Sequence, residues 1–182
     1  MLKALFSKID LSKQDHPLAK SYYSSIKDII ELEEFYELKD YYQHFSYTRF
    51  NHCVNVSYYC YLICKKLGWN ANSVARAGLV HDFYLYNWKD EQPIQGRHCN
   101  VHPKVALEMA KKYMEVDYVM EDAILNHMWP MSFHMPKTKE AWILQGVDKY
   151  CALCEILYQS SKKARFSALA TTLFLLSIHV SI

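Results

Sequence analysis

The chain has 182 residues, of which 51% are hydrophobic, enough for one domain with a buried core. It contains only four Gly and five Pro, too few turn formers for the short connections of a β-sandwich or barrel, so we expect a mostly helical domain. With 21 basic and 19 acidic residues, the formal net charge is +2, which argues against a dedicated nucleic-acid-binding protein.

Two stretches in the first half of the chain have helical spacing of their apolar residues. The first predicts one long amphipathic helix over 17–44, or two helices with a break. The second predicts a helix over 49–67 that ends at Gly68, a residue typical of helix ends. Asn72 or Ser73 is then the expected N-cap of a short helix, rich in small residues.

The second half of the chain begins with a polar stretch, 87–101, which we interpret as a loop. We expect the next helix to open at His102 and Pro103, because proline is tolerated in a first turn. Further helices are predicted over 117–127 and from 138 to about 160. The apolar segment 164–180 is short and polar-interrupted for a membrane span, so a buried last helix is expected.

The six cysteines do not form the pattern of a disulfide framework. Cys151 and Cys154 form a Cys-x-x-Cys pair, but no second pair completes a four-thiolate zinc site. We interpret the cysteines as packing residues. Because the chain also has no signal-like start, we expect a cytoplasmic protein.

Side chains that bind transition metals recur at the ends and on the faces of the predicted helices. They are His52, His81, Asp82, His102, His127 and Asp148. The helices of a bundle can bring such positions together at one depth. Imidazoles with a few carboxylates favour manganese, iron, nickel or zinc over calcium, and a buried carboxylate needs such a partner.

The order of these residues resembles the HD-domain superfamily of metal-dependent phosphohydrolases. The resemblance rests on a helical His in RFNHCVNV, an adjacent His-Asp pair in AGLVHDF and a distal Asp in QGVDKY. It covers about residues 47–160. The resemblance implies an all-α, single-domain helical bundle of the HD-domain type, in which a divalent metal is held by His52, His81, Asp82 and Asp148.

Superfamily members with two metals have two more histidines before the last Asp, and His102 and His127 resemble those positions. His98, one helical turn before His102, is an alternative ligand. The resemblance then implies two ions bridged by Asp82, with iron, manganese, nickel, zinc or magnesium as candidates. Such ions lower the pKa of a water and polarise phosphoryl oxygens, so the implied reaction is hydrolysis of a phosphoester or phosphoanhydride.

The chain departs from the HD-GYP cyclic-dinucleotide phosphodiesterases. Phe83 and Tyr84 follow the His-Asp pair where that branch has Gly-Lys, and the chain has no GYP motif. The pattern looks closer to the small bacterial HD hydrolases that split dinucleoside polyphosphates. We therefore expect a small phosphorylated substrate, nucleotide-like in character.

Basic side chains near the proposed ligands are candidate substrate contacts. They are Arg49, Arg97, His98, Lys104 and Lys149. Arg49 lies three residues before His52 on the same helix face, and Lys149 directly follows Asp148. Asp82, Arg49 and Lys149 are the predicted catalytic residues, with the basic side chain of Arg49 or Lys149 stabilising developing charge. A solvated charge or a structural ion pair is the alternative for each basic residue.

The sequence thus predicts one domain over 1–182 with an HD-like core over 47–160. An N-terminal helix, 17–44, and a C-terminal helix, 164–180, are expected to pack on this core. The predicted function is metal-dependent phosphohydrolysis by an activated water. The alternative is a non-catalytic, metal-holding HD domain that acts as a nucleotide sensor or interaction module. Neither nucleic acid nor a membrane is an expected partner, and a homodimer is a candidate assembly.

Overall fold

The computed structural model describes residues 2–179 except 14, 45, 88–89 and 91–94. The side chains of residue 44 and of residues 163–179 are also outside the described part.

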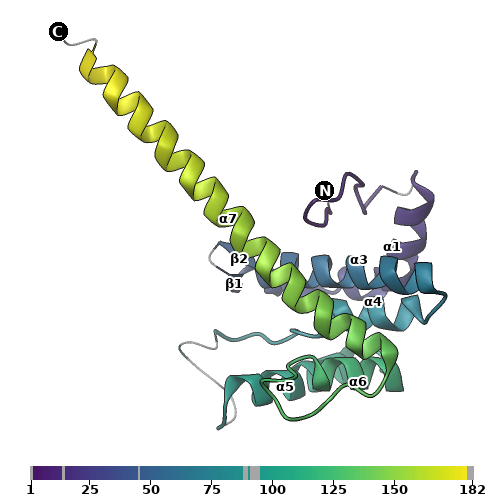
Figure 1. Ribbon diagram of the computed structural model, residues 1–182. Helices are drawn as coiled ribbons and strands as arrows, with labels where there is room; N and C mark the ends of the chain where they lie inside the picture. The colour runs from purple at the N-terminus through teal and green to yellow at the C-terminus, as the bar shows by residue number, and fades with distance from the viewer. Residues whose placement is uncertain (1, 14, 45, 88–89, 91–94, 180–182) are drawn as a thin grey trace.

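The structure confirms an all-α bundle. Its helices are α1 (Pro17–Ile30), α2 (Glu33–Tyr36), α3 (Arg49–Leu67), α4 (Ala71–Val80), α5 (His98–Tyr113), α6 (Tyr118–Asn126) and α7 (Lys139–His179). A 3₁₀ turn η1 (Glu37–Lys39) and an antiparallel hairpin of β1 (Tyr42–His44) and β2 (Tyr47–Thr48) connect α2 to α3. Figure 1 shows α3 and α4 side by side, crossed by α7, with α5 and α6 below them.

The central helix α3 begins and ends as its sequence predicts. Thr48 caps its start, because the Thr48 hydroxyl accepts a hydrogen bond from the Asn51 amide at 3.3 Å. Gly68 closes it in the left-handed conformation, with a φ of 67°. Between these caps α3 buries side chains on several faces, since α4 and α7 both pack on it.

A glycine sets the distance between α3 and α4. A Cβ added at Gly78 would lie only 2.8 Å from the Cα of Ser57, so no larger residue fits this contact. Ser57 also joins the two helices, because its hydroxyl donates to the Ala75 carbonyl at 2.6 Å. This close packing brings His52 on α3 next to His81, which ends α4.

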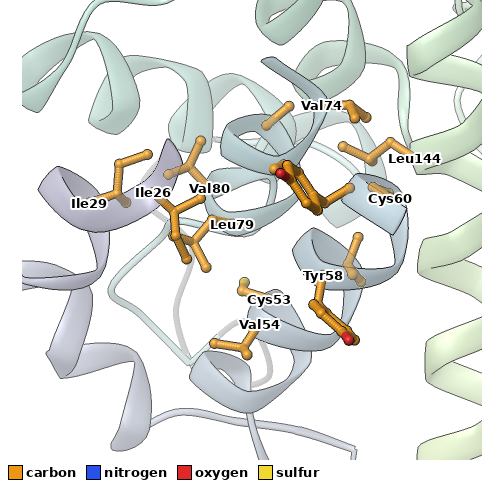
Figure 2. Packing of buried hydrophobic residues seen from close by; sticks show 14 of the residues in the cluster. Ile26, Ile29, Cys53, Val54, Tyr58, Cys60, Val74, Leu79, Val80 and Leu144 are labelled. Atoms are coloured by element: carbon orange, nitrogen blue, oxygen red, sulfur yellow. The ribbon is translucent and has the colours of Figure 1, made fainter. Parts of the chain in front are cut away.

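The hydrophobic core joins α1, α3, α4 and α7, parts of which Figure 2 shows, and it extends to buried residues of α5 and α6. Ile26 and Ile29 of α1 lie against Leu79 and Val80 of α4. Such fully buried side chains each stabilise a fold by roughly 1.5–3 kcal/mol. The core therefore fixes the helices whose ends carry the histidines.

Buried cysteines belong to this core. Cys53, Cys60, Cys64 and Cys151 are buried, and all of them are free thiols. Burial raises the pKa of the Cys53 and Cys60 thiols well above the ordinary value. These side chains act as small apolar groups, as predicted.

The region 17–44 is not one helix. α1 ends at Ile30, and Leu32 is extended before the four-residue α2. Phe35 and Leu38 follow the apolar spacing and are buried. They lie in the short elements α2 and η1, however, and not in a continuation of α1. The predicted single N-terminal helix is therefore wrong, while the break between two helices is confirmed.

Two helix starts also differ from the prediction. The N-cap of α4 is Asn70, whose side-chain oxygen accepts from the Ser73 amide at 3.1 Å. α5 begins at His98 rather than His102, so Pro103 lies inside the helix. The Arg97 carbonyl already accepts from the amides of Asn100 and Val101, which closes a helical turn before the proline.

α7 runs without interruption from Lys139 to His179. The predicted end near 160 and the separate helix at 164–180 are therefore wrong, since neither Gly nor Pro interrupts 147–179. In Figure 1 the C-terminal half of α7 leads away from the other helices instead of folding back on them. Across the described residues, none of the helices combines the length and apolar character needed to cross a bilayer.

Candidate metal centre

Three imidazole rings are fixed by hydrogen bonds to backbone carbonyls near helix ends. The Nδ1 atoms of His81, His102 and His127 lie 2.8 Å from the carbonyl oxygens of Gly78, His98 and Ile124. A carbonyl only accepts hydrogen bonds, so each Nδ1 carries the ring hydrogen. In the neutral ring, each Nε2 then presents a lone pair.

The fourth imidazole, His52, is held by a carboxylate. Its Nδ1 lies 3.0 Å from Oε2 of Glu155, and the Asn55 amide donates to Oε1 of Glu155 at 2.7 Å. Glu155 is fully buried and was not predicted as part of the site. It follows Asp148 by seven residues, two turns along the same face of α7, and this spacing is the signal that would have indicated it.

The Nε2 atoms of all four rings turn toward two aspartates. Nε2 of His52 lies 3.0 Å from Oδ1 of Asp148, and Nε2 of His81 lies 3.6 Å from the same oxygen. We call His52, His81 and Asp148 the His52 side of the centre.

We call the other two histidines, His102 and His127, the His102–His127 side of the centre. Their Nε2 atoms lie 2.9 Å apart, and Oδ1 of Asp82 lies 3.2 Å from Nε2 of His102 and 3.7 Å from Nε2 of His127. Because both rings donate their Nδ1 hydrogen to a backbone carbonyl, the Nε2 lone pairs of the neutral rings point at each other. A cation between them removes this repulsion.

Asp82 connects the two sides. Its Oδ1 faces His102 and His127, while its Oδ2 lies 3.7 Å from Nε2 of His81. Oδ2 also accepts a hydrogen bond from the Gln43 side chain of β1 at 2.6 Å. The carboxylate thus presents one oxygen to each side of the centre.

Two buried polar atoms at the centre indicate that a cation belongs there. Nε2 of His81 and Oδ1 of Asp82 make no hydrogen bond with any residue that the structure describes. An unpaired buried polar atom costs about 1–3 kcal/mol. Ligand atoms of two trios lie within 4.8 Å of one another, His52 with His81 and Asp148, and His81 with Asp82 and His127. These nitrogen and oxygen donors fit a divalent transition metal.

The two sides differ in their protonation without metal. Burial lowers the pKa of His52, but Asp148 and Glu155 outweigh it and raise that pKa to about 10. Burial, followed by the charges of His102 and His81, lowers the pKa of His127 to about 3. Burial raises the pKa of Asp82, yet the neighbouring histidines hold it well below the ordinary value.

All six predicted ligands converge in the structure. His98 does not join them, because its Nε2 lies 3.3 Å from the Tyr84 hydroxyl and its ring stacks on His102 at 4.5 Å. Burial and the charge of His102 lower the pKa of His98 to about 4. Of the two alternatives, His102 is therefore the residue that meets Asp82 and His127.

The prediction that Arg49 contacts the substrate is wrong. Its side chain is 1% exposed and lies 3.5 Å from the Tyr84 ring centroid. Its guanidinium donates to the carbonyls of Tyr84 and Tyr86 and to the Gln43 side chain. Arg49 instead positions the chain that follows Asp82, together with the glutamine that holds this carboxylate.

The centre opens on a cavity of about 260 Å³. Its lining comprises Gln43, Asp82, Tyr84, His98, His102, His127, Met128, Met131, Asp148, Lys149 and Ala152. Lys149 lines this cavity. Its Nζ lies 3.6 Å from Oδ2 of Asp148 and donates to the His127 carbonyl at 2.8 Å, which is also the geometry of a structural ion pair. His98 also lines this cavity. Arg97 is exposed before α5, and Lys104 lines a different cavity, so neither reaches the metal cavity.

Comparison with known proteins agrees with this geometry. A family model described as the HD domain matches residues 49–153, more than half of the chain. A search of solved structures found no significant match. The matched range includes His52, the His81–Asp82 pair and Asp148. The chain therefore belongs to the HD-domain family, within the superfamily of metal-dependent phosphohydrolases.

Proposed function

We propose that the protein is a phosphohydrolase that cleaves a phosphoester or phosphoanhydride bond of a small, nucleotide-like metabolite. One observation carries the proposal: four Nε2 atoms and two carboxylates converge beside one cavity, and each imidazole has its Nδ1 engaged elsewhere. Such a donor set is suited to cations and is poorly stabilised without them.

Two divalent ions fit the donors. His52, His81 and Asp148 would hold one ion, His102 and His127 would hold the other, and Asp82 would contact both. The nitrogen-rich set favours iron, manganese, nickel or zinc over magnesium. When bound, the ions supply Lewis acidity toward phosphoryl oxygens and lower the pKa of a nearby water.

The chain's own residues orient these groups and line the substrate space. Glu155 and Gln43 fix the directions of His52 and Asp82 through the hydrogen bonds given above. Lys149 lines the cavity with its ammonium group beside Asp148. There the ammonium can bind a phosphoryl oxygen and stabilise developing negative charge.

The cavity limits the size of the enclosed part of the substrate. Its 260 Å³ is below the roughly 300–1,000 Å³ of pockets that enclose drug-sized ligands. A phosphoryl group and a small attached group fit within it. Tyr84 and Met131 supply an aromatic and an apolar wall for the organic part of the substrate.

Phosphate release from a substrate panel tests the proposal. The protein would be loaded separately with manganese, iron, nickel, zinc or magnesium and incubated with nucleotides, dinucleoside polyphosphates and simple phosphoesters. We expect metal-dependent turnover of at least one class, lost in Asp82→Ala and kept in Glu108→Gln, an exposed carboxyl outside the cavity lining. Bound metal and tight nucleotide binding without any turnover would contradict the proposal and support a sensor.

A further inference from the structure

Gln43 of β1 lines the metal cavity, and the hairpin that carries it is fixed on both sides. On one side, the Tyr41 hydroxyl donates a hydrogen bond to the Leu85 carbonyl at 3.1 Å. On the other side, the amide and the hydroxyl of Ser46 both donate to Oε1 of Gln159 on α7 at 2.9 Å. The fold therefore sets the position of Gln43 beside the cavity.

A buried arginine determines which end of the Gln43 side-chain amide faces Asp82. Nε of Arg49 lies 3.2 Å from this amide, and a guanidinium only donates hydrogen bonds, so the atom that it meets is the amide oxygen Oε1. The amide nitrogen Nε2 then faces Asp82 and donates to Oδ2 at 2.6 Å. The reversed amide would place an N–H against a donor and an oxygen against a carboxylate, so this orientation is the stable one.

The amide nitrogen of Gln43 has one hydrogen to spare. It carries two hydrogens, and Asp82 accepts one of them. None of the residues that the structure describes accepts the other. The side chain is partly exposed where it lines the cavity, so this donor is available to a molecule bound there. A phosphoryl oxygen is a charged acceptor, and hydrogen bonds to charged acceptors are the stronger ones.

We propose that Gln43 is a substrate-binding residue that donates its second amide hydrogen to a phosphoryl oxygen in the metal cavity. The inference rests on the proposed phosphohydrolase function and adds a neutral donor to the cationic one of Lys149. Because Asp82 holds the other hydrogen, one amide would fix the phosphoryl group relative to the carboxylate that joins the two sides. A donor that the fold already orients loses little freedom when the ligand binds.

Binding of inorganic phosphate tests this contact without turnover. Wild-type protein and Gln43→Met, which has a similar length but no N–H donor, would be saturated with zinc. Zinc content would be measured by mass spectrometry and the phosphate Kd by titration calorimetry. We expect about two ions in both proteins and a Kd about tenfold or more higher in Gln43→Met.

Two further variants control for the hairpin. Gln43→Ala should raise the phosphate Kd as much as Gln43→Met, and it provides a second measurement if methionine disturbs the hairpin. Tyr42→Thr changes the neighbouring residue of β1, whose side chain is 63% exposed and does not line the cavity. This matched control should keep the wild-type Kd.

A spectroscopic signal separates contact with phosphate from an effect through Asp82. The side-chain amide of Gln43 would be followed by ¹⁵N–¹H NMR in the zinc-loaded protein and assigned by its loss in Gln43→Met. Phosphate should shift the second amide hydrogen downfield and should shift the hydrogen bonded to Asp82 less. A residue that only holds Asp82 would not show this difference.

Four results would overturn the inference. They are a wild-type protein that binds no phosphate, an unchanged phosphate Kd in both Gln43 variants, an amide signal that phosphate does not shift, and loss of zinc from Gln43→Met at saturating zinc. The last result would limit Gln43 to holding Asp82.

Phosphate release from the substrate panel distinguishes this failure from that of the proposed function. Phosphate binding through Gln43 without turnover of any substrate would contradict the hydrolase and leave the contact in place. Turnover together with an unchanged phosphate Kd in the Gln43 variants would contradict the contact alone.

Discussion

On the His52 side of the metal centre, both ring nitrogens of one imidazole lie 3.0 Å from carboxylate oxygens. On the His102–His127 side, two Nε2 atoms face each other at 2.9 Å, and the nearest carboxylate oxygen is that of Asp82 at 3.2 Å. Both sides lie in the same bundle. On the first side carboxylates surround an imidazole ring, whereas on the second side two imidazole nitrogens face each other.

This difference indicates what each side requires. Without metal, the His52 side compensates itself, because a protonated His52 pairs with Asp148 and Glu155. The His102–His127 side has no such arrangement, since the lowered pKa of His127 keeps its ring neutral. We therefore expect a bound cation to stabilise the second side more than the first.

Asp82→Ala should have the largest effect, because Asp82 faces both sides. We expect the metal content to fall from about two ions toward zero and phosphohydrolysis to fall by about three orders of magnitude or more. Metal content by mass spectrometry and phosphate release would be measured together. A variant that retains both ions would refute the bridging role of this carboxylate.

His52→Ala and His127→Ala should separate the two sides. Each should lower the metal content by about one ion, because each removes a nitrogen ligand from one side. Competition with a chelator should show that the ion left in His127→Ala is the one held by the His52 side. An unchanged metal content in both variants would exclude the two-ion arrangement.

Glu155→Gln should weaken only the His52 side. Loss of the charge that holds Nδ1 of His52 should reduce metal affinity on this side by about 10–100-fold, as for other residues that orient a metal ligand. Chelator competition would measure the two affinities, with Glu108→Gln as the exposed control. Equal weakening on both sides would mean that Glu155 supports the fold rather than one ligand.

The pH dependence of the metal-free protein should have opposite signs for the two sides. The pKa of His52 rises from 6.5 to about 10 on folding, so its contribution to the free energy of unfolding is complete below pH 6.5 and lost toward pH 10. The pKa of His127 falls from 6.5 to about 3, so protonation of the unfolded state reduces stability as the pH falls between these values.

Urea unfolding with a chelator present would test these signs. His52→Gln should reduce the loss of stability at alkaline pH, and His127→Gln should reduce the loss at acidic pH. If both variants changed the same part of the pH profile, the proposed contrast between the two sides would be wrong.

Asp28→Asn should have the smallest effect. Asp28 pairs with Arg76 at 2.7 Å, but its side chain is 58% exposed. The change should lower the free energy of unfolding by less than about 1 kcal/mol, as measured by urea unfolding. The metal affinities of the two sides should be unaltered, and a change in either would mean that the centre is coupled to the surface of α1.

The six metal-ligand candidates were predictable because they lie on predicted helices or at their ends and follow the order of ligands in the HD-domain superfamily. Gly78 illustrates what spacing alone does not show. It allows α3 and α4 to approach closely, and its carbonyl orients His81, but both effects depend on the tertiary contact with Ser57. The ligand types are therefore visible in the sequence, while the contacts that orient them require the structure.

The residues that sequence reasoning missed or misassigned depend on contacts between distant segments. Gln43 reaches Asp82 from a hairpin whose strands contain two or three residues, too short for a clear alternating pattern. Arg49 was correctly placed next to the site, but the carbonyls of Tyr84 and Tyr86 take its donors only in the folded chain.

The metal content of the wild-type protein tests the central claim most directly. The protein would be purified, loaded with manganese, iron, nickel or zinc, freed of unbound metal and measured by inductively coupled plasma mass spectrometry. The convergence of six ligands predicts about two ions per chain for at least one of these metals. Fewer than one ion per chain for every metal would contradict a metal centre, and a single ion would contradict its two-sided form.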